Sequence, residues 1–241
     1  MAWARPKFDF HTGWACWNTH SAREESDSFR LMALAVLGRG LLGNAPRGSK
    51  SGRGQKAVAL YETIVATVKN QWPENRNEIL QMKANLAVAY EEAGRVDQGI
   101  VIKRECLIDA KAMTGPRSEL TLVCADNLAV ALMAKGSFTE ARTLLKAQLE
   151  YQADAPLDNE LLIRLFTNYA NLLYKDPDAV PDDLLESIAM YEKCLPAAQR
   201  LWGASHPYPM QFEKHLGKAR AALAAPKSAR FERALKRARK D

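Results

Sequence analysis

One ten-residue segment occurs twice in this chain of 241 residues. The first copy, NLAVAYEEAG, runs from Asn85 to Gly94, and the second, NLAVALMAKG, runs from Asn127 to Gly136, so both ends are displaced by 42 positions. A fixed period of this length is typical of repeat architectures, in which each unit buries its apolar face against its neighbours. The period constrains the fold more tightly than any property of the composition.

The repeating unit is predicted to be a helix, a tight turn and a second helix. After each closing glycine comes a segment with apolar residues at helical spacing, GRVDQGIVIKRECL and GSFTEARTLLKAQL. Gly94 and Gly136 are expected to adopt the left-handed backbone that ends a helix and reverses the chain. Further copies of the second helix are KAVALYETIV and ESIAMYEKCL, and NYANLLYK from Asn168 is a third copy of the first helix. The stretch KDPDAVPDD from Lys175 is expected to loop out the extra residues before the last copy.

Small residues recur where the two helices of a pair would cross, because a small side chain lets paired helices approach closely. The second helices supply Ala57, Gly99, Ala141 and Ser187, and the first helices supply Ala87, Ala129 and Ala170. Two positions depart from the pattern. Lys103 stands where the other copies have a large apolar residue (Tyr61, Leu145 and Tyr191), and Gln148 stands where they have Ile64, Cys106 and Cys194. We therefore expect looser packing in the middle copies.

These residues resemble the tetratricopeptide repeat. The order Asn-Leu-Ala, an apolar residue, Gly, and a small residue five positions later is similar to that family, over roughly residues 54–222. The 42-residue period and the stretch LWGASHPYPM from Leu201 are similar to the kinesin light chain type. The resemblance implies an all-α fold, an α-solenoid that winds as a right-handed superhelix of about four antiparallel helix pairs with a C-terminal basic helix. We expect a Trp-rich leader over 1–25, the repeat array over 26–222, and a basic helix or tail over 223–241.

The asparagine that opens each copy of the repeated segment is the candidate functional residue. In a helix, Asn85, Asn127 and Asn168 point about 100° away from the core-facing residue that follows each of them, toward the inner surface of a stacked array. A carboxamide offers a donor and an acceptor, so it can bond the backbone of an extended peptide. The resemblance implies this use, because kinesin light chain and similar scaffolds place an asparagine here for that purpose. The alternative is that each asparagine takes part in a hydrogen-bond network within the helix stack.

The neighbours of the asparagines on the same helix faces complete the predicted groove. These positions are Gln81, Val88, Val123, Val130, Arg164 and Asn171. They mix apolar, neutral polar and basic groups without a dense basic cluster. The sequence therefore predicts a non-catalytic scaffold that binds an extended, partly apolar peptide segment of a protein partner. It gives neither the identity of that partner nor the oligomeric state of this chain.

The positive charge of the chain is concentrated at its C-terminal end. The net charge is +6, of which residues 211–241 contribute +7 and the remainder contributes −1. The segment SARFERALKRARK can form a basic helix. It would act as a cap on the last repeat, as a nuclear targeting patch, or as a contact to nucleic acid or an acidic membrane surface. An adaptor that acts through this tail is the alternative function.

Signals for catalysis and metal binding are weak. His11, Cys16 and His20 could ligate zinc, but no fourth ligand follows at metal-like spacing, so a zinc-dependent enzyme is the weakest alternative. No nucleophile elbow or phosphate-binding glycine loop is present, and we expect no enzyme activity and no cofactor. His206 is expected at a turn or helix start, His215 as a further groove residue or a packing residue, and Cys106 and Cys194 as core thiols. Unpaired cysteine spacing and the lack of a secretory signal or transmembrane run favour a cytoplasmic location, or a nuclear one through the basic tail.

Overall fold

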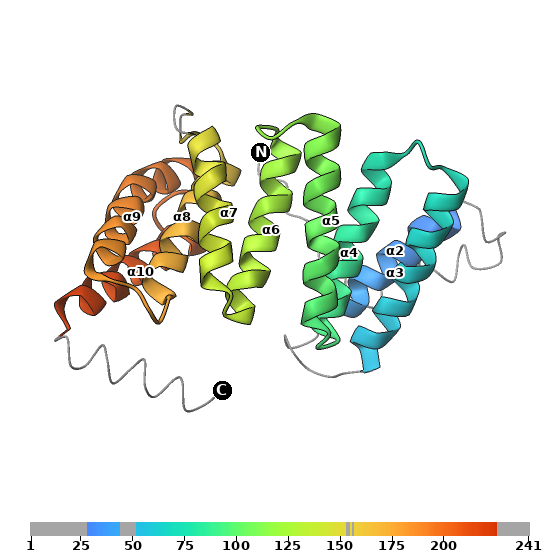
Figure 1. Cartoon of the computed structure of the whole chain (residues 1–241), viewed down its shortest axis with the longest axis horizontal. Helices are drawn as coiled ribbons and strands as arrows, with labels where there is room; N and C mark the ends of the chain where they lie inside the picture. The colour runs from blue at the N-terminus through green and yellow to red at the C-terminus, as the bar shows by residue number, and fades with distance from the viewer. Residues whose placement is uncertain (1–27, 44–51, 153–154, 156, 226–241) are drawn as a thin grey trace. The chain divides into compact units, whose positions relative to one another are not determined.

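The computed structural model describes residues 28–43, 52–152, 155 and 157–225 (Figure 1). The leader expected over 1–25, with His11, Cys16 and His20, and the tail segment 226–241 lie outside the described residues. Every regular element in the described ranges is a helix, which confirms the all-α fold class. In chain order they are α2 (Ser28–Gly43), α3 (Gly52–Gln71), α4 (Arg76–Glu92), α5 (Val96–Thr114), α6 (Glu119–Lys135), α7 (Phe138–Tyr151), α8 (Glu160–Lys175), α9 (Pro181–Trp202) and α10 (Pro207–Ala224).

The helices belong to two compact units, of which the first ends at Met113 and the second begins at Thr114. The first unit contains the pairs α2/α3 and α4/α5. The second contains the pairs α6/α7 and α8/α9, followed by α10. This order gives the four helix pairs that the period predicted. It also assigns α2 as the first helix of the first pair, which the repeat pattern had not identified.

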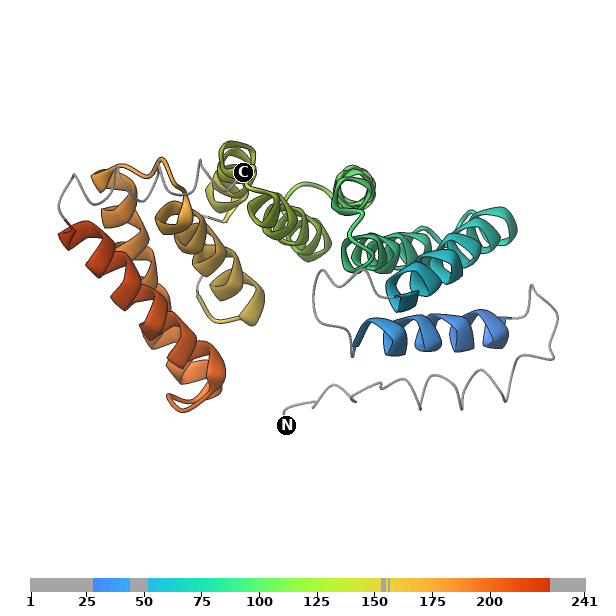
Figure 2. The ribbon, with the colours of Figure 1, turned by 90° about the horizontal axis from the view of Figure 1, so that it is seen from below.

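Tyr61 on α3 is the centre of the first unit's core. Its side chain is fully buried, and its hydroxyl donates a hydrogen bond to the carbonyl oxygen of Ala35 on α2 at 3.0 Å. α2 lies beside α3 (Figure 2), and the ring occupies the space beside Gly38. A Cβ at Gly38 would lie 2.7 Å from the Tyr61 ring. Only glycine therefore fits there while the tyrosine stays in place.

The small residues lie at the helix crossings, as the pattern predicted. A Cβ at Gly99 on α5 would come within 2.8 Å of the Ala87 carbonyl oxygen on α4. At the corresponding crossing in the second unit, the Ser187 hydroxyl on α9 donates to the Ala170 carbonyl oxygen on α8 at 2.8 Å. Each first helix thus presents a backbone carbonyl to the small residue of its partner, and a larger side chain would push the pair apart.

Two glycines end first helices as expected. Gly94 and Gly136 have φ values of 78° and 89°, the left-handed region that L side chains rarely adopt. After α6, Gly136 N–H donates to the Met133 carbonyl at 3.1 Å and Ser137 N–H donates to the Leu132 carbonyl at 2.8 Å. These bonds satisfy carbonyls at the end of the helix and turn the chain toward α7.

Ion pairs fill part of the space between α4 and α5. Lys83 is buried, and its ammonium lies 2.9 Å from Asp109 Oδ2 and 3.0 Å from Glu105 Oε2. Burial opposes the charge on Lys83, but the hydrogen bonds that its ammonium donates to the two carboxylates outweigh this effect and raise the lysine pKa. Lys103, where the pattern has a large apolar residue, is also buried and lies 2.5 Å from Glu91 Oε1. Its departure from the pattern is accommodated by charge pairing.

Aromatic side chains fill the corresponding space in the second unit, where α9 lies between α8 and α10 (Figures 1 and 2). Tyr191 on α9 is fully buried, with its ring centroid 6.4 Å from that of Tyr174 and 6.5 Å from that of Phe212. Cys194, one turn later, is also fully buried, and burial raises the pKa of its thiol to about 12. The thiol is therefore protonated and packs as a small apolar group, as predicted.

The turns of the second unit lie where the sequence predicted them. α8 ends at Lys175 and α9 begins at Pro181, so the extra residues of the last copy form the intervening turn. Arg142 on α7 holds that turn at both ends, through Asp176 at 3.3 Å and Asp183 at 2.8 Å. His206 caps α10 by accepting a hydrogen bond from the Tyr208 backbone N–H at 3.3 Å, which confirms its helix-start role.

Of the helices described, none is both long enough and apolar enough to cross a bilayer.

Candidate functional site

The three predicted asparagines lie on the first helices α4, α6 and α8, one turn or more from each helix end. The residues after them, which the pattern assigned to the core, are buried: Leu86, Leu128 and Tyr169, followed by Ala87, Ala129 and Ala170. The asparagines lie on the other side of each helix, Asn127 exposed and Asn85 and Asn168 partly exposed. The repeat thus separates a packed face from an accessible face on every first helix.

The other predicted groove residues are also accessible within their own units. Gln81 and Val88 on α4 are exposed; Val123 on α6 is partly exposed and Val130 exposed; and Arg164 and Asn171 on α8 are partly exposed. Val88 and Val130 hold the same repeat position, three residues after the asparagine, and are 40% and 41% exposed. An exposed apolar side chain at a matching position in both units is a feature that packing within the helix pair does not explain.

α6 and α8 are joined by a side-chain network that the sequence analysis did not anticipate. Asp126, the residue before Asn127, is only 2% exposed. Its Oδ1 accepts a hydrogen bond from Asn168 Nδ2 at 2.6 Å, and its Oδ2 accepts one from Arg164 Nε at 2.8 Å. Two predicted groove residues of α8 therefore converge on one buried carboxylate of α6. The available signal was the spacing, because Asp126 and Asn168 are one period apart in the sequence.

The asparagines differ in their bonding. Asn168 takes part in the Asp126 network, whereas the Asn85 and Asn127 side chains make no hydrogen bond to any described residue. One turn after Asn168, Asn171 has its Oδ1 occluded from solvent and without a hydrogen-bond partner. The exposed carboxamides are free to reorient toward a ligand, and the Asn168 carboxamide is held.

His215 on α10 occupies the position that the asparagine holds in the other first helices, and its side chain packs against aromatic rings. It is partly buried, with ring centroids 5.8 Å from Tyr174 and 6.2 Å from Tyr191. Burial, together with the positive charges of Lys175, Lys218 and Lys214, lowers its pKa from 6.5 to about 4. At neutral pH it is an uncharged ring that covers the end of the aromatic core.

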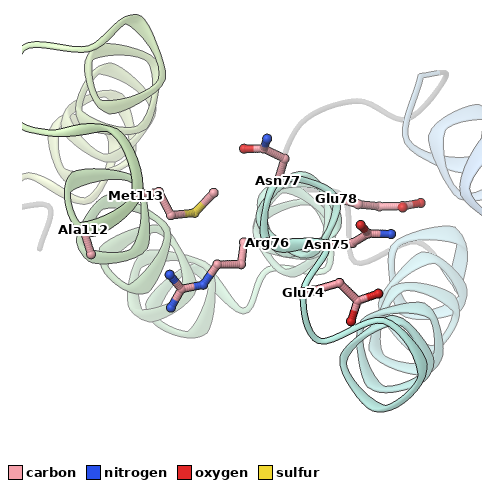
Figure 3. A pocket seen from close by; sticks show the side chains of 7 residues that line it. All are labelled: Glu74, Asn75, Arg76, Asn77, Glu78, Ala112 and Met113. Atoms are coloured by element: carbon pink, nitrogen blue, oxygen red, sulfur yellow. The ribbon is translucent and has the colours of Figure 1, made fainter.

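A polar hollow lies at the end of the α4/α5 pair in the first unit (Figure 3). It has a volume of about 500 Å³, and its lining consists of the residues at the start of α4, from Glu74 to Glu78, with Ala112 and Met113 at the end of α5. In Figure 3 the Arg76 side chain extends toward the α5 side. None of the nine predicted groove residues lines this hollow. In the described part of the chain, this hollow included, no three His, Cys, Asp or Glu side chains are grouped so as to hold a metal ion.

Comparisons with known proteins agree with this geometry. A family model described as a tetratricopeptide repeat matches residues 121–147, which cover most of α6 and the first part of α7. This match confirms the resemblance to the tetratricopeptide repeat for that part of the chain. No curated protein matches the sequence of this chain.

Solved structures similar to this chain include kinesin light chain-like repeats. A single-residue variant of a Podosopora anserina protein, described as a kinesin light chain with nearly identical TPR-like repeats, is 21% identical, with a TM-score of 0.66 over 90% of this chain and 95% of that chain. The Podosopora anserina protein without that change is 20% identical, with a TM-score of 0.65 and the same coverage. BtubC (BKLC) from P. vanneervenii is 18% identical, with a TM-score of 0.70 over 100% of this chain and 91% of that chain.

At these identities the likeness shows the fold alone. The tetratricopeptide repeat is in general a protein–protein interaction scaffold. Which surface binds, and what it binds, must be argued from the residues of the chain itself.

Proposed function

We propose that this chain binds extended peptide segments of a protein partner on the accessible faces of its first helices, α4 in the first unit and α6 and α8 in the second. The observation that carries the proposal is the recurrence, on first helices of both units, of an accessible asparagine followed three residues later by a 40–41% exposed valine. Neither feature is needed to pack the helix pairs, whose contacts come from the opposite face. A polar group for the peptide backbone beside an apolar group for its side chains is the arrangement that groove recognition uses.

The lining residues define the kind of peptide that fits. The asparagines and Gln81 offer neutral donors and acceptors, and the valines offer apolar contact. Arg164 is paired with Asp126, so its charge is largely neutralised before a ligand arrives. We therefore expect a partly apolar peptide of modest charge, and an affinity in the micromolar range because few side chains anchor it.

The test is a peptide selected on the wild-type protein from a random library displayed on phage, labelled with fluorescein, and titrated by fluorescence anisotropy. Asn127→Ala should weaken binding about fivefold, the loss of roughly one hydrogen bond, and hardly alter melting because the Asn127 side chain is exposed. The triple variant Asn85→Ala, Asn127→Ala and Asn168→Ala should weaken binding by about two orders of magnitude, the sum of three such losses.

The matched control is Asn70→Ala together with Asn77→Ala, which removes two exposed carboxamides outside the predicted groove. This control should bind the peptide as the wild type does. If the triple variant melts much lower than the wild type and its affinity for the peptide is unchanged, the asparagines are structural and the proposed function is wrong.

A further inference from the structure

The Asp126 network deepens the proposed function and rests on it. Asp126 is 2% exposed, and both of its carboxylate oxygens accept a hydrogen bond from α8. An ionised carboxylate only accepts hydrogen bonds, so the group that faces it must be a donor. The bond at 2.6 Å therefore fixes which end of the Asn168 carboxamide faces α6. Its NH₂ group points at Asp126, and its oxygen points elsewhere.

The orientation leaves Asn168 with a defined polarity. Its Oδ1 accepts no hydrogen bond from any described residue, and the side chain is partly exposed. A ligand that approaches this side chain meets an acceptor, which suits a peptide backbone N–H rather than a carbonyl. Asn127, which has no such bond, can turn either end of its carboxamide to the ligand.

The same carboxylate acts on Arg164. Its Nε is used by Asp126 at 2.8 Å, and its side chain remains 36% exposed. The guanidinium keeps its terminal N–H groups as donors, while the nearby negative charge reduces its pull on a free carboxylate. One buried residue thus presents an acceptor and a neutralised donor on adjacent turns of α8.

The repeat itself does not require an acidic residue at this position. The residue before the asparagine is Ala84 on α4 and Thr167 on α8, and the Thr167 hydroxyl bonds the Ile163 carbonyl of its own helix. Burying a carboxylate is costly unless it is fully paired. Its presence at one copy alone, bonded to two groove residues, is what a role in orienting those residues would produce.

We propose that Asp126 is a positioning residue for peptide binding, which holds Asn168 with its carboxamide oxygen toward the N–H groups of the bound peptide. Asp126 does not touch the peptide. It acts through Asn168 and, to a smaller extent, through Arg164.

The experiment is a double-mutant cycle between Asp126→Asn and Asn168→Ala, read out with the same fluorescein-labelled peptide. The asparagine at 126 has nearly the same shape as aspartate but offers an NH₂ group, which favours the reversed Asn168 carboxamide. Asp126→Asn should weaken binding about fivefold in the wild type and cause no further loss beside Asn168→Ala. Asp158→Asn, which neutralises an exposed aspartate in the turn before α8, is the control and should bind normally.

A second readout separates positioning from folding. Peptides that carry a single N-methyl group at successive positions lose one backbone N–H each. One such peptide should bind the wild type about fivefold more weakly, and neither Asp126→Asn nor Asn168→Ala should distinguish it from the unmethylated peptide. A variant that is merely destabilised would lower the melting temperature yet still make this distinction.

The outcomes distinguish the two proposals. If the triple asparagine variant binds like the wild type, the proposed function fails, and the role of Asp126 fails with it. If the triple variant loses binding while Asp126→Asn binds like the wild type, only the role of Asp126 is overturned. Equal losses from Asp126→Asn with and without Asn168 would also overturn it, because the residue would then act independently of the carboxamide.

Discussion

Lys103 and Tyr191 occupy the same repeat position in the two units, and their surroundings are opposite in character. Lys103 on α5 is buried against Glu91 of α4, and the same two helices share the ion pairs of buried Lys83 with Asp109 and Glu105. Tyr191 on α9 is buried among rings from α8 and α10. The crossing residues are small in both cases. The repeat therefore specifies how closely the helices approach, and leaves the filling of the remaining space to either charge pairs or aromatic rings.

The largest effect on stability should come from placing the lysine of the first unit at the tyrosine position of the second. Tyr191→Lys would put an ammonium among Tyr174, Phe212 and His215, none of which is negatively charged. We expect a loss of roughly 4 kcal/mol in the free energy of unfolding, since an unpaired buried charge replaces a packed ring. Urea denaturation followed by circular dichroism measures it. Tyr191→Phe should cost about 1 kcal/mol or less, and similar losses for both variants would contradict the contrast.

The next effect comes from removing the negative partners of a buried lysine. Glu105→Gln with Asp109→Asn would leave Lys83 buried without a carboxylate, and we expect a loss of about 2 kcal/mol because both acids are about half exposed and Lys83 can reach some water. Adding Lys83→Met should restore most of this loss, because a buried ion pair and a packed apolar group are of similar worth. A triple variant no more stable than the double variant would show that the pairing is not the cause.

A smaller effect, of opposite sign, is expected at Gln148 on α7. This side chain is fully buried, and neither its Oε1 nor its Nε2 has a hydrogen-bond partner. Gln148 therefore takes part neither in an ion pair, as Lys103 does, nor in a cluster of aromatic rings, as Tyr191 does. Gln148→Leu should stabilise the protein by about 1 kcal/mol, since two unsatisfied polar atoms are removed from the core. The melting temperature should rise, while Gln211→Leu at an exposed position of α10 should leave it unchanged. No rise at Gln148 would point to a water that satisfies the amide.

The smallest effect is a pH dependence that belongs to the aromatic region alone. His215 has a folded-state pKa of about 4, below its ordinary 6.5, so the unfolded chain takes up the proton first as the pH falls. Stability should therefore be complete above pH 6.5 and should decline between pH 6.5 and 4. His215→Gln should show a shallower decline in melting temperature over that range. Parallel profiles for the two proteins would mean that His215 is not the titrating group.

The sequence predicted the turns and the small residues at the helix crossings, but it predicted little about which side chains pack between the helices. Gly94 and Gly136, Ala87 and Ala170 follow from the steric demands of turns and crossings, which allow few residue types. α2 was not recognised as a first helix, because its copy lacks the Asn-Leu-Ala order and the segment 44–51 lengthens the spacing to α3. Lys103 and Gln148 depart from the sequence pattern and led us to expect looser packing, although both side chains are buried.

The candidate site was predicted in position but not in detail. Helical periodicity placed the asparagines and valines on accessible faces, because the side of a helix is a local property of the chain. The link from Asp126 to Arg164 and Asn168 depends on how α6 and α8 approach each other, which periodicity alone does not give. A search for acidic residues one period before Asn85, Asn127 or Asn168 would have found it.

The lengthened turn between α8 and α9 has a practical consequence. Arg142 forms ion pairs with Asp176 and Asp183, one on each side of the exposed residues Pro177 and Asp178. The chain is therefore held on both sides of these two residues. Residues inserted between the two aspartates should hardly displace either helix. A fluorophore or short epitope inserted there would report on the molecule, or tether it to a surface, while the helices that carry the asparagines keep their register.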